Sequence, residues 1–318
     1  MEPKRNSSIL SRPELHYSLE YSFLRSLTWQ DPSANVIVFM KGSTMTDPLA
    51  QRIAIIGLGK LGGILARAFI EKGLIGKDQT AATVAHQSRA DSLAGEFRFP
   101  VSADNSAVVQ NAEIVLLCVK PRNVGSVCQE IDSALSPSHL LISVAASVPT
   151  QYIEDHLTRH VPVVRAMPNT PCQVGDGMTA ICSGRFADSN HLNLTQKLFD
   201  TVGRTVILDE KHMDAVTGLS ASGPAFIYVI LESLAEAGVK VGLPRGTATL
   251  LAAQTTLGAA RVALETGSHP ALLKDSVTTP AGCTIDGLLE LEEGKLRVTL
   301  IKAVVKAVQR AGELLPEK

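Results

Sequence analysis

A glycine-rich segment carries the first residues whose spacing could do chemistry. Gly57, Gly59 and Gly62 form a G-x-G-x-x-G pattern that directly follows the apolar run 52–56 and precedes a helical stretch. The first glycine permits a tight turn, the second lets the backbone approach a pyrophosphate, and the third allows close packing of helix on strand. The amino end of the helix then attracts the phosphate charge. The segment therefore predicts a dinucleotide site.

The end of the next expected strand indicates which nicotinamide cofactor binds. A carboxylate there would bind the ribose 2′-hydroxyl of NAD, but this chain has His86, Gln87, Ser88 and Arg89 instead. Gln87 and Ser88 can donate hydrogen bonds, and Arg89 can pair with a 2′-phosphate. NADP(H) is the preferred cofactor on this basis, with NAD(H) as the second choice. The alternative for Arg89 is an ordinary solvated side chain at the start of a helix.

Three further segments combine turn-forming and polar residues. Segments 118–121 and 167–171 contain prolines that end a strand, so both are expected at the ligand-bearing edge of a sheet. Within them Lys120 either binds a cofactor phosphate or is solvated, and Asn169 either bonds a carboxamide or caps its own turn. Segment 277–284 combines three hydroxyls with a glycine and a proline, so it either binds an anion such as a carboxylate or simply links two helices.

A sheet must bring these segments together, and the first part of the chain predicts one. Short apolar runs typical of buried parallel strands alternate with helical or loop segments, which favours an α/β fold with a Rossmann-type doubly wound parallel sheet. The first expected helix covers 64–70 and ends near Gly73. The expected strands are 52–56, 82–85, 114–119, 140–144 and 163–166.

After about Asp209 the pattern changes to long Ala-, Leu-, Val- and Gly-rich segments. Helices are expected over 225–238, 245–265 and 295–313, and Ala248, Leu251, Ala252 and Thr255 share one helix face. A face of small residues packs helices closely and indicates pairing with another subunit. The expected organisation is an extension at 1–44, either disordered or preceding a true start at Met45, then a dinucleotide-binding domain at 45–209 and an all-helical substrate and dimerisation domain at 210–318.

Composition narrows the function classes. The chain has 318 residues, 45% of them hydrophobic, and a formal net charge of -1. Without an excess of positive charge or a basic run, nucleic-acid binding is not expected. The richest apolar stretches, such as 246–264, are interrupted by Thr, Gln and Arg, so no membrane span of ~20 apolar residues is expected.

The cysteines and the start of the chain bear on the compartment. Five cysteines without a C-x-x-C pair favour reduced thiols in a cytoplasmic protein. The first residues show neither the apolar run of a signal peptide nor the acid-poor composition of a transit peptide. No H-E-x-x-H pattern or close His, Cys and Asp cluster predicts a metal, and no G-x-S-x-G elbow predicts a serine nucleophile.

Taken together, the motifs resemble one family, pyrroline-5-carboxylate reductase. The likeness spans about residues 51 to 312 and includes two long motifs in the helical half, which makes it far more specific than the glycines alone. The matching segments are IIGLGKLG (55–62), VKP (119–121), SVAA (143–146), RAMPNTP (165–171), DAVTGLSASGPA (214–225), HPALLKD (269–275) and VTTPAGCTI (277–285).

The resemblance implies the last step of proline synthesis. NAD(P)H would give a hydride to the C=N bond of 1-pyrroline-5-carboxylate and make L-proline. The active site would lie between the nicotinamide face of one subunit and the helical domain. The helical domains would interlock in a homodimer as the minimal unit, with a larger homo-oligomer such as a decamer built from it.

The resemblance also assigns residues by position. Thr284 would hydrogen-bond the ring nitrogen of the substrate as the catalytic residue, and the loop 280–284 would hold its carboxylate through backbone N–H groups. The implied substrate-binding set is Ser276, Gly282, Cys283 and Thr284, with Ser276 near the cofactor. Together with Ser88 and Asn169 from the motifs above, the cofactor-binding set is Ile56, Gly57, Leu58, Gly59, Lys60, Leu61, Gly62, Gln87, Arg89, Asn105, Cys118, Val119, Lys120, Pro121 and Ala145.

Three departures from the family pattern put the exact loop geometry in doubt more than the activity. Ala281, Ser147 and Ala221 each stand where many members have glycine, and each adds a small side chain where the backbone approaches a ligand. Two other functions stay open. A hydroxyacid dehydrogenase-like reductase would need a proton donor, for which Lys211 in a K-x-x-D spacing with Asp214 is the candidate, and a non-catalytic NADP(H)-sensing protein would need only the first domain.

Overall fold

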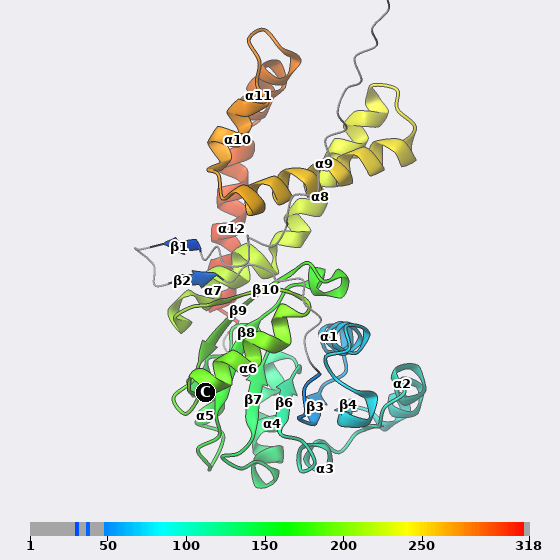
Figure 1. Ribbon diagram of the computed structural model, residues 1–318, viewed down its shortest axis with the longest axis vertical. Coiled ribbons are helices and arrows are strands. Elements are labelled where there is room, and N and C mark those ends of the chain that lie inside the picture. Colours follow the sequence, from blue (N-terminus) through cyan, green and yellow to red (C-terminus); the bar gives the residue numbers. More distant parts are fainter. Residues whose placement is uncertain (1–28, 32–35, 39–47, 315–318) are drawn as a thin grey trace, which may run out of the picture.

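The computed structural model describes residues 29–31, 36–38 and 48–314. In Figure 1 an α/β unit forms the lower part of the molecule, and a group of long helices projects upward from one edge of its sheet. We call residues 210–312, from the 3₁₀-helix η6 (Glu210–His212) to the end of the last helix, the helical arm.

The sheet has ten strands in the order β1-β2-β10-β9-β8-β7-β6-β3-β4-β5. From β5 to β8 every pairing is parallel, whereas β9 runs antiparallel to β8 and β10 runs parallel to β9. This is the doubly wound arrangement expected from the sequence, with a reversal at β9. The strands are β1 (Trp29–Asp31), β2 (Val36–Val38), β3 (Ile53–Ile56), β4 (Thr80–Thr83), β5 (Val101–Ser102), β6 (Ile114–Leu117), β7 (Leu140–Ser143), β8 (Val163–Met167), β9 (Gly177–Ser183) and β10 (Gly203–Ile207).

Helices cover both faces of the sheet because its strands are apolar on both sides. Ile53 and Ile55 of β3 point into one apolar layer and Ala54 and Ile56 into the other, as the period of two in a strand requires. Helices α1 (Lys60–Glu71), α2 (Ala90–Phe97) and α6 (Ser189–Asp200) contribute to the first layer. Helices α3 (Asn105–Val109), α4 (Val124–Ile131) and α5 (Thr150–Glu154) contribute to the second.

The helical arm rises from the sheet through an irregular base. Its chain passes from η6 into α7 (Met213–Val216), then into one π-helical turn, η7 (Thr217–Ala221), and on into α8 (Gly223–Lys240). The remaining helices are α9 (Arg245–Thr266), α10 (Pro270–Ser276), α11 (Cys283–Glu293) and α12 (Leu296–Gly312). Helix α12 returns to the base, where a Cβ at Gly218 would overlap the side chain of Val308. We call Glu210–Ala221 the arm base.

Close packing joins α8 to α9 through two of the four residues that share the expected helix face. A Cβ at Gly238 of α8 would lie 2.8 Å from the Cβ of Ala248, so a glycine is needed at this crossing. Ala248 and Ala252 are buried as expected, whereas Leu251 is 51% exposed and Thr255 is also exposed. The pairing of this helix face with a second subunit, which the sequence indicates, stays a prediction.

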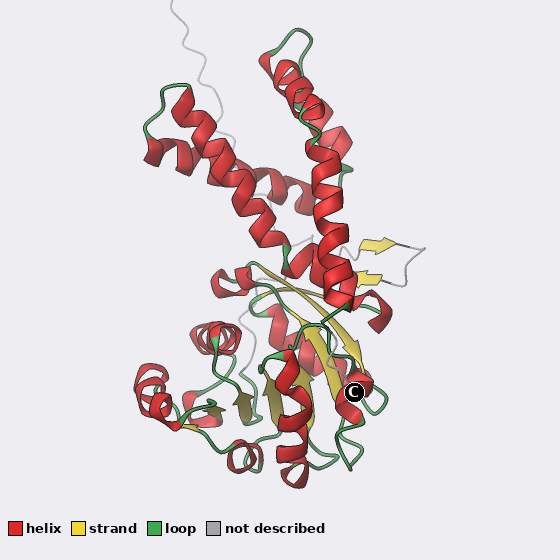
Figure 2. Ribbon diagram, turned by 180° about the vertical axis from the view of Figure 1, so that it is seen from behind, coloured by secondary structure: helices red, strands yellow, loops and turns green. Residues whose placement is uncertain are grey.

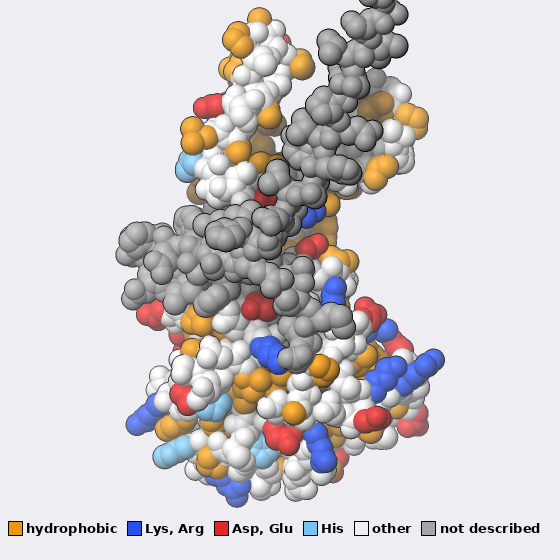
Figure 3. Space-filling model, in the orientation of Figure 1, with side chains coloured by type: hydrophobic (Ala, Val, Ile, Leu, Met, Phe, Trp, Pro, Cys, Tyr) orange, Lys and Arg blue, Asp and Glu red, His pale blue; other side chains and the backbone are white. Residues whose placement is uncertain are grey.

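The rest of the arm exposes apolar side chains, some of which are visible as orange atoms on the upper helices in Figure 3. Figure 2 shows these helices projecting away from the α/β unit. The segment Glu210–Lys240 is long and apolar enough, by length and composition, to be counted as a candidate membrane span, with 11% of its most apolar window buried. The exposed residues include Ile227, Tyr228, Leu234, Leu250, Leu251, Leu257, Val262, Leu264, Leu289, Leu291, Ile301 and Val305.

The expectation of an extension at 1–44 lies mostly outside the described residues. Within that range the structure describes two short strands, β1 (Trp29–Asp31) and β2 (Val36–Val38), which pair antiparallel with each other. Val38 of β2 pairs with Val206 of β10, so the two strands extend the sheet at that edge.

Candidate cofactor and substrate site

The glycine turn between β3 and α1 has the geometry that a dinucleotide needs. Gly57 has a φ of +96°, and a Cβ there would lie 3.1 Å from the carbonyl of Cys118. A Cβ at Gly62 would lie 2.5 Å from the carbonyl oxygen of Gly57, so helix and turn touch through backbone. At Gly59, by contrast, nothing lies within 4 Å of an added Cβ. The open side of the turn is therefore the side on which a ligand can approach the backbone.

The amino end of α1 is open as well. Gly59 is the N-cap residue, no side chain caps the helix, and its first turn holds no acidic residue. Lys60 is exposed at the first helical position. Unpaired N–H groups, the positive end of the helix dipole and this ammonium group together favour an anion such as a pyrophosphate.

The turn after β4 adjoins the glycine turn. The Leu58 amide donates to the Thr83 carbonyl at 2.7 Å, and the Gly57 amide donates to the Thr83 hydroxyl at 3.2 Å. Gln87, Ser88 and Arg89 then form the exposed 3₁₀-turn η2 (Gln87–Arg89).

Gln87 and Arg89 differ in how they are held. The Gln87 side-chain oxygen accepts from the Ala103 amide at 3.2 Å, which leaves its NH₂ group to donate. Among the described residues no side-chain hydrogen bond or ion pair engages Arg89. An exposed, unpaired guanidinium beside the glycine turn fits a 2′-phosphate.

The segment after β6 packs behind the glycine turn. The Cβ of Cys118 lies 3.2 Å from where a Gly62 Cβ would be, and the nearest atom to an added Gly57 Cβ is Val119 Cγ1. Burial raises the pKa of the Cys118 thiol, so this group is a neutral packing element and not a nucleophile. Lys120 is exposed, and Pro121 begins the short 3₁₀-helix η3 (Pro121–Asn123).

Three other residues of the expected cofactor set lie along the same sheet. Asn105 begins α3, and its side-chain Nδ2 donates to Glu130 Oε2 at 2.9 Å. Ala145 is buried just beyond β7. Asn169, beyond β8, donates to the Ser220 carbonyl at 3.2 Å and accepts from the Met178 amide at 2.9 Å. The Asn169 side chain therefore ties its turn to the arm base, a use not considered from the sequence, and its contact with a cofactor stays a prediction.

The expected substrate residues meet in the arm, around the loop 277–282 between α10 and α11. Gly282 is the N-cap residue of α11, which no side chain caps, and Cys283 is exposed at the first helical position. A Cβ at Gly282 would overlap the Thr279 hydroxyl, so glycine is required there. Thr284 is partly buried in the first turn, and the Ser276 hydroxyl donates to the Leu273 carbonyl at 2.7 Å.

The two residue sets do not meet within one chain. The cofactor residues lie at the carboxyl edge of the sheet, whereas the loop before α11 lies well up the helical arm in both views (Figures 1 and 2). The main contacts of α11 are with α12. A site that uses both residue sets, as the sequence predicts, would therefore need the arm of a second chain or a large movement of this one.

The candidate proton donor of the alternative reductase is placed elsewhere. Lys211 is exposed and its Nζ lies 2.9 Å from Asp209 Oδ2, while Asp214 faces Arg165 at 3.4 Å. Lys211 and Asp214 thus have different partners.

The described residues contain no group of three or more His, Cys, Asp and Glu side chains that could hold a metal ion, and all five cysteines are unpaired.

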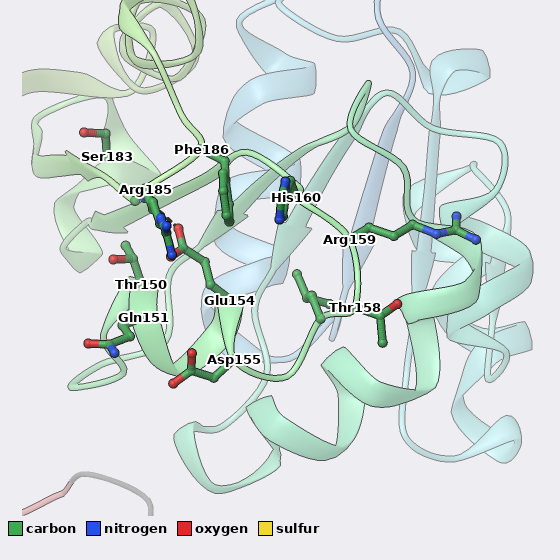
Figure 4. A pocket seen from close by; sticks show the side chains of 12 residues that line it. Thr150, Gln151, Glu154, Asp155, Thr158, Arg159, His160, Ser183, Arg185 and Phe186 are labelled. Carbon is green, nitrogen blue, oxygen red and sulfur yellow. Dashed lines mark hydrogen bonds between the residues drawn. The ribbon is translucent and has the colours of Figure 1, made fainter.

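A surface pocket of about 580 Å³ lies away from these residues (Figure 4). Val164 of β8 pairs with Ser183 at the end of β9, so the pocket lies toward the amino end of β8, opposite the glycine turn. His160 and Phe186 stack at 4.3 Å in its wall, and Glu154 accepts from the Arg185 amide at 2.7 Å. None of the residues expected in the site lines this pocket.

Sequence reasoning missed one charged cluster. Arg165 on β8 is 3% exposed, and its guanidinium lies 3.4 Å from Glu210 and 3.4 Å from Asp214. The available signal was a charged residue inside an otherwise apolar strand, since Arg165 belongs to the quoted RAMPNTP motif without a role assigned to it. Its partners are 45 and 49 residues away in sequence and could not be identified from it.

A doubly wound sheet with an open glycine turn, joined to an arm with exposed apolar helices, defines a dinucleotide-dependent oxidoreductase with an attached dimerisation domain. Family models divide the chain in the same way. Residues 52–147 match the NADP oxidoreductase, coenzyme F420-dependent model, and residues 210–314 match the pyrroline-5-carboxylate reductase dimerisation model.

Comparison with individual relatives shows to which family the chain belongs. The chain is 40% identical over 264 residues to the pyrroline-5-carboxylate reductase of Methanosarcina acetivorans, covering 83% of this chain and 98% of that one. It is 38% identical over 263 residues to that of Arabidopsis thaliana, covering 83% and 95%. The chain belongs to the pyrroline-5-carboxylate reductase family.

Solved structures agree with this assignment. The reductase of Coxiella burnetii superposes with a TM-score of 0.77 at 36% identity, covering 85% of this chain and all of that one. The Plasmodium falciparum enzyme, solved with NADP bound, superposes with a TM-score of 0.76 at 29% identity, covering 84% and 99%. The resemblance, fold class and cofactor class expected from the sequence are thereby confirmed.

Proposed function

We propose that this chain reduces the C=N bond of 1-pyrroline-5-carboxylate with NAD(P)H, NADPH preferred, to give L-proline. One observation carries the proposal: a glycine turn open to a dinucleotide is joined, in one chain, to a dimerisation domain that bears the Thr/Gly loop. The hydroxyacid dehydrogenase alternative is disfavoured because Lys211 and Asp214 form separate pairs.

The residues present fit the cofactor. Gly57 to Gly62 and the amino end of α1 would hold the pyrophosphate. Of the three glycines of the motif, only Gly59 has open space beside its backbone, and the pyrophosphate would lie there. Ser88 and Arg89 would hold the 2′-phosphate, which selects NADPH over NADH. Bound NADPH supplies the hydride.

The loop before α11 fits the substrate. Its uncapped first turn presents N–H groups that can hold the substrate carboxylate, and the Thr284 hydroxyl can hydrogen-bond the ring nitrogen. A protonated imine is already an electrophile, so the reaction needs orientation and charge complementarity more than a strong general acid. The absence of a committed proton donor in the motifs is consistent with this chemistry.

The working unit we propose is a homodimer, because the two residue sets lie apart in one chain and the arm exposes apolar helices. A larger assembly such as a decamer would be built from this dimer.

The proposed domains are 45–209 and 210–318, with the helical part beginning where Asp209 caps η6. We place the enzyme in the cytoplasm on its unpaired cysteines, without a nucleic-acid or membrane partner.

A spectrophotometric assay tests the activity. Loss of NADPH absorbance is followed with pyrroline-5-carboxylate and, separately, with a 2-keto acid. Oxidation with the imine alone supports the proposal, oxidation with the keto acid alone supports the hydroxyacid dehydrogenase alternative, and oxidation with neither supports a cofactor sensor.

The variant Thr284→Ala tests the substrate loop. We expect turnover to fall roughly ten- to a hundredfold, the range for one catalytic hydrogen bond. The matched control is Thr266→Ala, whose hydroxyl donates at 2.8 Å to the Val262 carbonyl within its own helix. Equal kinetics in the two variants would remove Thr284 from the mechanism.

A further inference from the structure

The buried guanidinium of Arg165 connects two parts of the molecule. It lies on β8, within the α/β unit, yet both carboxylates that neutralise it belong to the arm base. NH1 lies 3.4 Å from Glu210 Oε1 and NH2 lies 3.4 Å from Asp214 Oδ1. Because a buried charge without its partner is strongly destabilising, β8 and the arm base are held to one relative position.

Glu210 extends this connection to the neighbouring strand. The Thr150 amide donates to Glu210 Oε1 at 2.8 Å, and the Thr150 hydroxyl donates to Oε2 at 2.7 Å. Thr150 begins α5, which follows the turn after β7 that contains Ala145. One carboxylate therefore joins Arg165, in the middle of β8, to the start of α5, the helix that follows β7.

A third side chain holds the far end of the arm base. Asn169, beyond β8, donates to the Ser220 carbonyl in the π-helical turn η7. Such turns are rare and occur often at functional sites. Met167, Ala180 and Met213 form an apolar cluster between the sheet and the arm base. Apolar contacts are not directional, so they stabilise this interface without fixing the angle between the two parts. A planar guanidinium shared by two carboxylates does fix that angle.

The arm is long enough for that angle to matter. Helix α12 has 17 residues and packs on the arm base at Gly218, so it carries any rotation of the base outward. At 1.5 Å per residue its length is about 25 Å, and a tilt of about 5° moves its far end by about 2 Å. A misplacement of about 1 Å at a reacting centre can lower the rate by about a hundredfold.

We propose that Arg165 is a positioning residue for hydride transfer. Through Glu210 and Asp214 it fixes the tilt of the helical arm on the α/β unit, and so sets where the substrate loop of an arm meets the nicotinamide. The inference rests on the proposed function. Because Arg165 is 3% exposed and faces Glu210 and Asp214, we assign it no contact with substrate or cofactor.

The test compares Arg165→Lys with Arg245→Lys in the full chain. Lysine keeps the charge but cannot hold two carboxylates in a fixed plane. Arg245 makes an exposed ion pair with a single carboxylate, Glu236, between α9 and α8 and outside the arm base, so its replacement controls for the loss of an arginine pair elsewhere in the arm. For Arg165→Lys we expect kcat to fall about tenfold or more, with the Kd for NADPH and the dimer mass unchanged, and with a larger deuterium isotope effect on kcat. Arg245→Lys should match the wild type in all four.

Two outcomes overturn the proposal. One is a folded Arg165→Lys with wild-type kcat, and the other is a loss of kcat that merely follows a loss of NADPH binding or of the dimer. If Arg165→Lys does not fold, the same measurements are made on Asp214→Asn, which removes the charge of one partly exposed partner of Arg165. The same two outcomes in that variant would overturn the proposal.

A readout without turnover separates this proposal from the proposed function. Amide hydrogen exchange in the arm base should speed up in Arg165→Lys and stay unchanged in α9. If the wild type reduces no imine but exchange changes in this way, the proposed function fails while the role of Arg165 in holding the arm stands. Unchanged exchange in the arm base contradicts that role whatever the activity.

Discussion

Gly59 is the residue at which folding and cofactor binding can be separated. An added Cβ has nothing within 4 Å, so Gly59→Ala should fold normally, yet the methyl group would stand where a pyrophosphate approaches. We expect NADPH affinity to fall about tenfold or more, equivalent to about 1.4 kcal/mol. Fluorescence titration with NADPH measures it.

The control for this prediction is Gly63→Ala, four residues further along. A Cβ there would meet Phe97 Cζ at 3.6 Å, which is ordinary van der Waals contact inside the protein. Gly63→Ala should therefore bind NADPH like the wild type, and equal affinities in the two variants would contradict the assignment of the pyrophosphate to this turn.

Arg89 carries the prediction about cofactor choice. Because its guanidinium is exposed and has no partner among the described residues, Arg89→Ala should leave folding and NADH kinetics unchanged. The ratio of kcat/KM for NADPH to that for NADH should fall roughly ten- to a hundredfold, as expected for one lost charge-assisted contact. A ratio that does not move means that Arg89 is not the phosphate ligand.

At the scale of elements, two of the departures from the family pattern occupy strained backbone. Ser147, in the turn after β7, has a φ of +64°, and Ala281, before α11, has a φ of +57°. Both values lie in the left-handed region that favours glycine, the residue that many family members have there. Ser147 is in addition 2% exposed, and its hydroxyl has no hydrogen-bond partner in the part of the chain that the structure describes.

Ser147→Gly should therefore stabilise the protein. Relief of the backbone strain and removal of an unpaired buried hydroxyl outweigh the extra chain entropy of glycine, for a net gain of about 1 kcal/mol. Ser147→Ala separates the two causes, because it removes the hydroxyl but keeps the strained φ. Urea unfolding of both variants measures the gain, and no increase for Ser147→Gly would show that the strain is compensated locally.

Strands that consist of a continuous apolar run were predictable from the sequence. Strands that contain polar residues or begin with glycine were not. The run before Gly57 predicts β3 to within one residue. For β4 the expected range was two residues too late, because Thr80 and Thr83 form the strand and Thr83 binds the glycine turn. The strands β5, β9 and β10 were not expected, since β5 has two residues and the other two begin with glycine.

The candidate site follows the same rule. The turns after β3, β4 and β6 could be placed at one sheet edge because parallel strands carry their loops there. The roles of Arg165 and Asn169 could not, because each depends on a partner 45 or more residues away that only the folded arm base supplies. Leu251 shares the helix face of Ala248 and Ala252 but is 51% exposed in one chain, because α9 packs on α8 through the small residues; the contact of Leu251 with a second subunit stays a prediction.

At the scale of the whole molecule, the separation of the two residue sets gives a test of how the site is assembled. Gly59→Ala damages the sheet edge and Thr284→Ala damages the arm, so neither homodimer should have full activity. If each site joins the sheet edge of one subunit to the arm of its partner, a mixed dimer contains one intact site. Random exchange of subunits should then restore about a quarter of the wild-type sites.

The control mixes Gly59→Ala with the double variant Gly59→Ala, Thr284→Ala, which leaves no intact cofactor turn. Native mass spectrometry confirms that mixed dimers form. Mixed dimers without recovered turnover would mean that each subunit closes its own arm over its own sheet.

The exposed apolar helices of the arm have a thermodynamic consequence. Side chains such as Leu250, Leu257 and Ile301 remain in water in a single chain, whereas the α/β unit has two filled apolar layers of its own. Association must therefore supply much of the stability of the arm, and by mass action that part weakens on dilution. If the site is shared between subunits, we expect a dilute solution to lose the ordered arms and that site while the sheet of the α/β unit is still folded.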